Sequence, residues 1–195
     1  MSSIVGHASA GVAVYLCRAR LTDARAAAGL PLLVLLAIAP DFDYLAYWLF
    51  HLDFQPRFTH SLAFCLALSV LAWGLTTPAR RAAPAFPGLL ACAIGACSHV
   101  LLDLLVGVHP VPVLWPLPLP EWSAPFGILP SAGRMRLTNL YFWRNLLIEC
   151  GVLLPLYALL VALMRDVPVR RLGRHALLLG PLWAAFLVWS LRVHG

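Results

Sequence analysis

The amino-acid sequence predicts an all-α protein, a polytopic membrane bundle of about four to six apolar helices. Two observations support this class. Of 195 residues, 62% are hydrophobic and 11% are charged, whereas soluble domains average about 45–50% and about 25%. The apolar residues also form six runs separated by arginines, prolines or polar residues, at 4–17, 26–50, 61–77, 86–108, 146–164 and 175–193. The length favours one domain over residues 1–195.

The runs differ in how well they suit a membrane span. Several are shorter than the roughly 20 residues that cross a bilayer as a helix. Run 26–50 is long enough but contains Pro40, Asp41 and Asp43, which predict a broken or re-entrant helix. Thr59 precedes run 61–77 and is predicted either to cap that helix or to orient the neighbouring His60. The number of complete spans therefore stays open.

The longest connection, between Val108 and Arg144, is rich in proline. Its seven prolines exclude a helix and a central strand, so we predict an extended, semi-rigid cover. Its aromatic residues suit the membrane interface, either as anchors only or as part of a site. The prolines are 110, 112, 116, 118, 120, 125 and 130, and the aromatics are Trp115, Trp122, Tyr141 and Trp143.

Charge predicts the partners and the orientation. The formal net charge is +6, and all 14 basic residues are arginines scattered between the apolar runs. No basic stripe results, so we expect membrane lipids and no nucleic acid as partners. With six spans, one side carries nine arginines and the other five, which places both termini outside the cytoplasm. The nine are Arg18, Arg20, Arg25, Arg80, Arg81, Arg165, Arg170, Arg171 and Arg174; the five are Arg57, Arg134, Arg136, Arg144 and Arg192.

His99 and Asp103 form the most informative polar pair. They lie four residues apart in the apolar run Leu89 to Val108, so a helix stacks them on one face. Ionisable groups in lipid cost roughly 2.5 kcal/mol or more each, so the pair requires a partner. We predict a metal ion, with a hydrogen-bonded staple between helices as the alternative.

Other ionisable residues fall toward the same membrane side in this topology. Imidazole and carboxylate groups together suit zinc, manganese or non-haem iron, and such sets often hold two ions that hydrolyse phosphoesters. Asp41 or Asp43 is expected to take a proton from water, and Arg57 either to bind a substrate anion or to face lipid headgroups. The candidate ligands are His7, Asp41, Asp43, His60, His99, Asp103 and Glu149.

Several short motifs in order resemble the YdjM-like family of membrane-bound, metal-dependent hydrolases, also described as LexA-regulated inner-membrane hydrolases. The motifs are Gly6-His7, PDFDY at 40–44, RFTHSL at 57–62, SHVLLDLL at 98–105 and VPVLWPL at 111–117. The resemblance covers about residues 4–150 and leaves the C-terminal helices at 146–193 largely outside. It implies a multi-pass protein of the bacterial inner membrane, and the arginine count predicts that the site lies on the extracytoplasmic side.

The family is distantly similar to the all-α zinc phospholipase C and single-strand nuclease fold, which implies metals bound between helices. Carried over, the resemblance implies one or two divalent ions, zinc first and manganese or iron next. The implied ligands are His7, Asp41, Asp43, His60, His99 and Asp103, with Glu149 a weaker addition.

One motif departs from the family pattern. Many relatives have His-Arg-Gly-x-Thr-His-Ser, whereas this chain has Gln-Pro-Arg-Phe-Thr-His-Ser at 55–61. Either His51 or Arg57 substitutes for the missing pair, or one metal position is weakened.

Three functions remain open on the sequence. The first is a metal-dependent hydrolase that cleaves a phosphoester or lipid-linked substrate with activated water. The second is a proton- or metal-coupled transporter that uses the same Asp and His residues. The third is a membrane scaffold without catalysis. The one-sided cluster and the lack of an internal repeat favour the hydrolase.

Overall fold

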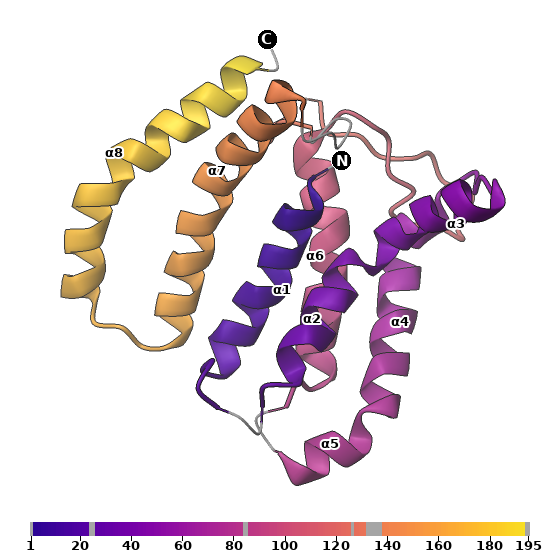
Figure 1. The fold of residues 1–195 in the computed structure, drawn as a ribbon, viewed down its shortest axis with the longest axis horizontal. Helices are drawn as coiled ribbons and strands as arrows, with labels where there is room; N and C mark the ends of the chain where they lie inside the picture. Colours follow the sequence, from indigo (N-terminus) through magenta and orange to yellow (C-terminus); the bar gives the residue numbers. More distant parts are fainter. Residues whose placement is uncertain (1, 24–25, 84–85, 126, 132–137, 194–195) are drawn as a thin grey trace.

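The computed structural model describes residues 2–23, 26–83, 86–125, 127–131 and 138–193, and this part of the chain is helical without a named strand (Figure 1). Each of the six apolar runs contains a helix, which confirms the all-α class. The elements are α1 (Ile4–Arg18), α2 (Gly29–Ile38), the 3-10 helix η1 (Ala39–Phe42), α3 (Asp43–Phe50), the 3-10 helix η2 (Phe58–His60), α4 (Leu62–Leu75), α5 (Thr77–Ala82), α6 (Leu89–Val106), α7 (Leu140–Met164) and α8 (Val169–Val193).

Four helical stretches are long and apolar enough to cross a membrane: Gly29–Phe50, Leu89–Val106, Leu140–Met164 and Ala176–Val193. The helices α1 and α4 are apolar but shorter. Only 6% of the stretch in α8 is buried within the protein, so its apolar surface suits contact with lipid.

The ends of the helices follow from local chemistry. Ser3 caps α1 by accepting a hydrogen bond from the Gly6 amide, and Asn139 caps α7. Ser61 caps α4 with extended backbone and a bond from the Phe64 amide at 3.1 Å. The predicted cap at Thr59 is therefore replaced by a cap two residues later, because the backbone turns through η2 first.

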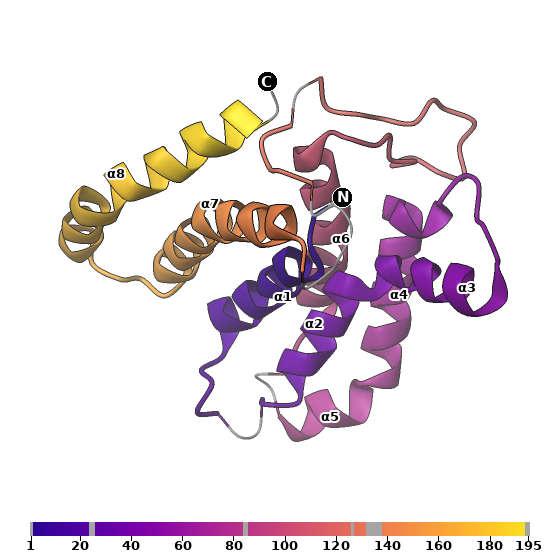
Figure 2. The same ribbon diagram turned by 45° about the horizontal axis from the view of Figure 1, so that its top comes forward.

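The centre of the bundle is formed by α1, α2 and α6, with α4 packed on α6 and α7 packed on α1 (Figure 1 and Figure 2). Between α1 and α2 the backbones approach closely: a Cβ atom on Gly11 would lie 2.6 Å from the Leu33 carbonyl oxygen. Tyr15, Leu33 and Val100 belong to the buried core of this region. The helix α8 packs against α7 at the periphery.

The Pro-rich connection contains no helix in its described part. Val111 and Trp122 exchange backbone hydrogen bonds of 2.7 and 2.8 Å, which folds the segment back on itself. The amides of Ile128 and Leu129 both donate to the Leu105 carbonyl at the end of α6. The connection thus lies over one end of the bundle, as Figure 2 shows. Arg25, Arg134 and Arg136, which entered the charge count, lie outside the described residues.

Candidate metal centre

Five of the predicted site residues come together where α1, η1, η2 and α6 meet. His7 is in α1, Asp41 in η1, His60 in η2, and both His99 and Asp103 are in α6. Each side chain is at most 9% exposed. Residues more than 90 positions apart therefore share one buried polar cluster.

Four of these residues direct one atom each toward a common centre. His60 Nε2 lies 3.5 Å from Asp41 Oδ1 and 3.6 Å from Asp103 Oδ2. His99 Nε2 lies 3.7 Å from Asp41 Oδ1 and 3.5 Å from Asp103 Oδ2. These distances exceed those of protein hydrogen bonds, about 2.7–3.2 Å. All four atoms are buried without a hydrogen-bond partner, although buried polar atoms are nearly always paired.

The spacing fits a divalent cation at the centre. Ligand bonds of about 2.0–2.2 Å in a tetrahedral zinc site place neighbouring ligand atoms about 3.3–3.6 Å apart, and the four imidazole-to-carboxylate distances of 3.5–3.7 Å come close to this. Among the described residues, the groups whose ligand atoms all lie within 4.8 Å of one another hold three residues each: His60, His99 and Asp103, and His7, Asp41 and His99. Two imidazole nitrogens and two carboxylate oxygens are also ligands that zinc, manganese and iron accept. The residues present therefore fit the metal that the resemblance implies.

Hydrogen bonds on the far side orient both imidazole rings. His99 Nδ1 lies 2.8 Å from the Ala37 carbonyl oxygen, which can only accept, so Nδ1 carries a hydrogen, and in the neutral ring Nε2 is then the atom with the lone pair. Thr59 donates to Asp43 at 3.1 Å, and its hydroxyl lies 3.0 Å from His60 Nδ1. Burial lowers the pKa of His60, which favours the neutral ring that binds metal.

Asp43 has a different set of partners from Asp41. Its two oxygens accept hydrogen bonds of 2.7 Å from Nε and a terminal nitrogen of Arg57, a bidentate ion pair. The guanidinium also stacks 4.5 Å from the centre of the Tyr44 ring. Burial opposes the charge on Arg57, but the bonds to Asp43 outweigh it and raise the pKa of the guanidinium. The Asp43–Arg57 pair thus lies beside the four converging atoms.

His7 lies on the other side of the cluster. Its ring stacks on His99 with centroids 3.7 Å apart, and its Nε2 is 3.5 Å from Asp103 Oδ1. Neither ring nitrogen has a hydrogen-bond partner. Possible ligand atoms of His7, Asp41 and His99 lie within 4.8 Å of one another, as do those of His60, His99 and Asp103. Asp103 faces imidazoles with both oxygens: Oδ1 lies near His7, and Oδ2 near His60 and His99.

Glu149 lies behind the cluster. It accepts hydrogen bonds from the Ser3 amide at 3.0 Å and from the Ser2 hydroxyl. The Ser2 amide in turn donates to Asp103 Oδ1 at 3.0 Å. The structure thus connects Glu149 to Asp103 through the N-terminal segment, a role for Ser2 and Ser3 that the sequence did not indicate. His51, the other substitute considered, is exposed at the end of α3.

A cavity of about 480 Å³ opens onto the cluster. Its lining includes His60 and Asp103 of the cluster, together with Asp43 and Arg57. The outer wall comes from α3 and from the Pro-rich connection, including Tyr47 and Glu121. A molecule in this cavity would meet the cluster, the arginine and the connection at once.

A helical bundle with membrane-spanning helices and a buried His/Asp cluster defines a polytopic membrane protein with a candidate metal site. Comparison with known families agrees: the model of the YdjM inner membrane protein family matches residues 1–169, and the chain belongs to that family. The protein is therefore a multi-pass inner membrane protein. No curated protein and no solved structure matches the chain, so the zinc phospholipase-like fold stays a prediction. The family match ends where α8 begins.

Proposed function

We propose that this protein is a metal-dependent hydrolase that cleaves a phosphoester or lipid-linked substrate with activated water. One observation carries the proposal: His60, His99, Asp41 and Asp103 direct unpartnered, buried ligand atoms at one another across 3.5–3.7 Å. Without a cation, this arrangement would bury unpaired polar atoms at a cost of about 1–3 kcal/mol each. A cation would satisfy all four atoms.

In this proposal the four residues hold the ion, zinc first and manganese or iron as alternatives. His7 would either be a further ligand of this ion or hold a second ion together with Asp103 Oδ1. A bound divalent ion supplies Lewis acidity, which polarises a phosphoryl oxygen and lowers the pKa of water toward neutrality.

The residues beside the ion position supply binding and proton transfer. Arg57 borders the cavity and is held in place by Asp43 and Tyr44, so it can bind a substrate phosphoryl oxygen. Asp43 also borders the cavity and accepts the proton of the attacking water. From the sequence, either Asp41 or Asp43 could be the general base that takes the proton from water. The contact of Asp41 with both imidazoles favours Asp43 for this step.

The transporter alternative predicts ionisable groups at successive depths of the bundle. The buried charged side chains of the described residues instead gather in and around the one cluster. Elsewhere, Ser69 is buried with its hydroxyl bonded to the Cys65 carbonyl. One compact cluster, without further buried charges along the bundle in the described residues, supports hydrolysis over passage through the bundle.

The test is to purify the protein in detergent and to measure bound metal, thermal stability and hydrolysis of a panel of bacterial lipids and phosphoesters. We expect one or two equivalents of metal, and a chelator should lower the unfolding temperature and abolish hydrolysis. A proton carrier predicts no bound metal. The hydrolase proposal fails if no metal, no chelator-sensitive stabilisation and no hydrolysis appear with zinc, manganese or iron supplied.

The arginine count further supports a site on the extracytoplasmic side. Cysteines introduced near Glu121 in a cysteine-free background should react with a membrane-impermeant thiol reagent in intact cells. Cysteines near Arg80 or Arg170, at the arginine-rich end, should react only after the cells are opened. The reverse labelling pattern would place the cavity on the cytoplasmic side.

A further inference from the structure

We propose that the substrate is a lipid of the leaflet on the cavity side, and that α3 and the Pro-rich connection form a collar embedded in that leaflet. We define the collar as residues 43–52 and 110–122. The inference rests on the proposed hydrolase and specifies its substrate class. The lipid headgroup would enter the cavity while its acyl chains stay in the bilayer beside α3.

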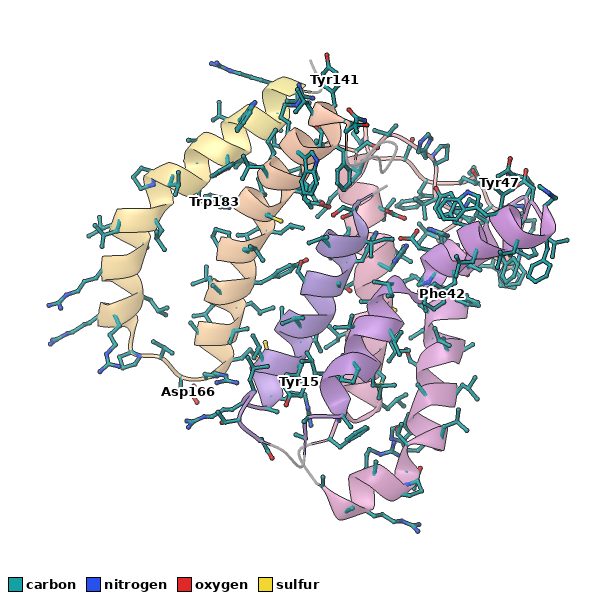
Figure 3. All side chains as sticks on the ribbon, viewed as in Figure 1. Tyr15, Phe42, Tyr47, Tyr141, Asp166 and Trp183 are labelled. Atoms are coloured by element: carbon teal, nitrogen blue, oxygen red, sulfur yellow. The ribbon has the colours of Figure 1, made fainter. Side chains whose placement is uncertain are left out.

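The first step is to locate the opposite membrane boundary. Arg18 ends α1, and α5 carries Arg80 and Arg81. Arg165, at the end of α7, donates to the Leu16 carbonyl at 2.7 Å and to the Ala19 carbonyl. The ends of α1 and α7 therefore lie side by side, and α5 is at the same end of the bundle (Figure 1). Figure 3 shows Asp166 at this level and Tyr141 at the other end of α7.

The second step is the depth of the cluster. At a rise of about 1.5 Å per residue, His7 lies about 16 Å along α1 from Arg18. On α6, His99 and Asp103 lie about 15 and 21 Å from Leu89. The hydrocarbon layer of a bilayer is about 30 Å thick. The cluster is therefore inside this layer, and extends from about its middle toward the cavity side.

The third step concerns α3, which continues the apolar run of α2 without continuing its direction. The 3-10 helix η1 separates the two helices, and α3 leaves the bundle sideways in both views (Figure 1 and Figure 2). Trp48, Leu49 and Phe50 at its outer end are 61–69% exposed. Apolar groups this exposed mark a contact with a partner or a membrane.

The position of the collar favours lipid as its partner. The collar lies at the cavity end of the bundle and continues the apolar surface of the spans. In the connection, Leu117, Leu119 and Trp122 are 52–57% exposed. Leucines beside tryptophans suit the boundary between acyl chains and headgroups. Both parts of the collar therefore match the outer half of one leaflet.

The cavity joins the collar to the cluster. Tyr44, Tyr47 and Pro110 of the collar line it, as do His60 and Asp103 of the cluster. Eight of the fifteen residues that line the cavity belong to the two segments that contact lipid in this proposal. A water-soluble phosphoester would gain nothing from the collar, whereas a lipid is held there at high local concentration with its phosphoester near the cluster.

The test compares two substrates with one headgroup in vesicles of phosphatidylethanolamine and phosphatidylglycerol: the long-chain lipid and a water-soluble short-chain analogue. We expect wild type to prefer the long-chain lipid at least tenfold. The triple variant Trp48→Ser, Leu49→Ser, Phe50→Ser should lower long-chain hydrolysis at least tenfold more than short-chain hydrolysis. The double variant Leu177→Ser, Leu178→Ser changes residues that are 79% and 78% exposed on α8, and should keep the wild-type ratio.

Two further measurements distinguish a misfolded variant from an incorrect collar proposal. Metal content should be the same in the triple variant and wild type, which shows that the cluster is intact. Vesicles with brominated acyl chains should quench wild-type tryptophan fluorescence more than that of Trp48→Phe. Equal hydrolysis rates on both substrates, or equal quenching of wild type and Trp48→Phe, would contradict the collar proposal but not the hydrolase proposal. If neither substrate is cleaved, the hydrolase proposal fails and the quenching result alone decides whether the collar contacts lipid.

Discussion

Replacing His99 or Asp103 with alanine is expected to lower the metal bound to the purified protein to less than a tenth of the wild-type amount. Each residue supplies an atom that faces two others of the cluster at 3.5–3.7 Å. Its removal would leave a buried imidazole or carboxylate that no longer completes a four-ligand site. The measurement is metal per protein by elemental analysis after extensive dialysis.

The matched control is His109→Ala. His109 borders the same cavity but is not among the clustered residues, so its variant should keep the wild-type metal content. The unfolding temperature of His99→Ala should also become insensitive to chelator. Full metal content in both variants would show that His99 and Asp103 only hold α6 against the neighbouring helices by hydrogen bonds.

The second large effect separates the two aspartates of η1 and α3. Asp41→Asn keeps the size of the side chain but removes the charge that balances the metal, so metal and hydrolysis should both be lost. Asp43→Asn should retain metal and lose hydrolysis on the order of 10²–10⁴-fold, because Asp43 holds Arg57 and accepts the proton. Metal content and turnover are measured on the same preparations.

Two controls are needed to interpret the results of the Asp41→Asn and Asp43→Asn variants. Without metal, Asp41→Asn should be at least as stable as wild type, because a neutral amide is easier to bury than a carboxylate. Arg57→Lys keeps the charge but cannot form the bidentate pair, so it should raise KM more than it lowers kcat. Wild-type turnover by Asp43→Asn would remove Asp43 from the mechanism, and unchanged metal in Asp41→Asn would remove Asp41 from the ligands.

Much of the fold was predictable because its causes are local. Apolar runs and the proline and arginine residues between them are properties of neighbouring positions, and a helix of apolar residues satisfies its own backbone in lipid. The stacking of His99 and Asp103 also follows from one helix turn. For the same reason the sequence alone indicated an ionisable face inside an apolar helix.

Other features depended on short differences in backbone geometry. Asp41 and Asp43 are two residues apart, and the passage from η1 into α3 turns one toward the imidazoles and the other toward Arg57. Thr59 was the predicted cap, but Ser61 also carries a hydroxyl, and its extended backbone makes Ser61 the cap. Sequence patterns could not resolve these choices, since both residues of each pair carry suitable groups.

The sequence by itself determined that this protein is a helical membrane protein and which ionisable residues it places in apolar surroundings. Only the tertiary structure decided which of them meet. His60, His99, Asp41 and Asp103 converge, Glu149 bonds to the N-terminal segment, and α3 leaves the bundle. The physical reason is that distances between residues far apart in the chain depend on how helices pack, and close approaches such as that at Gly11 set this packing.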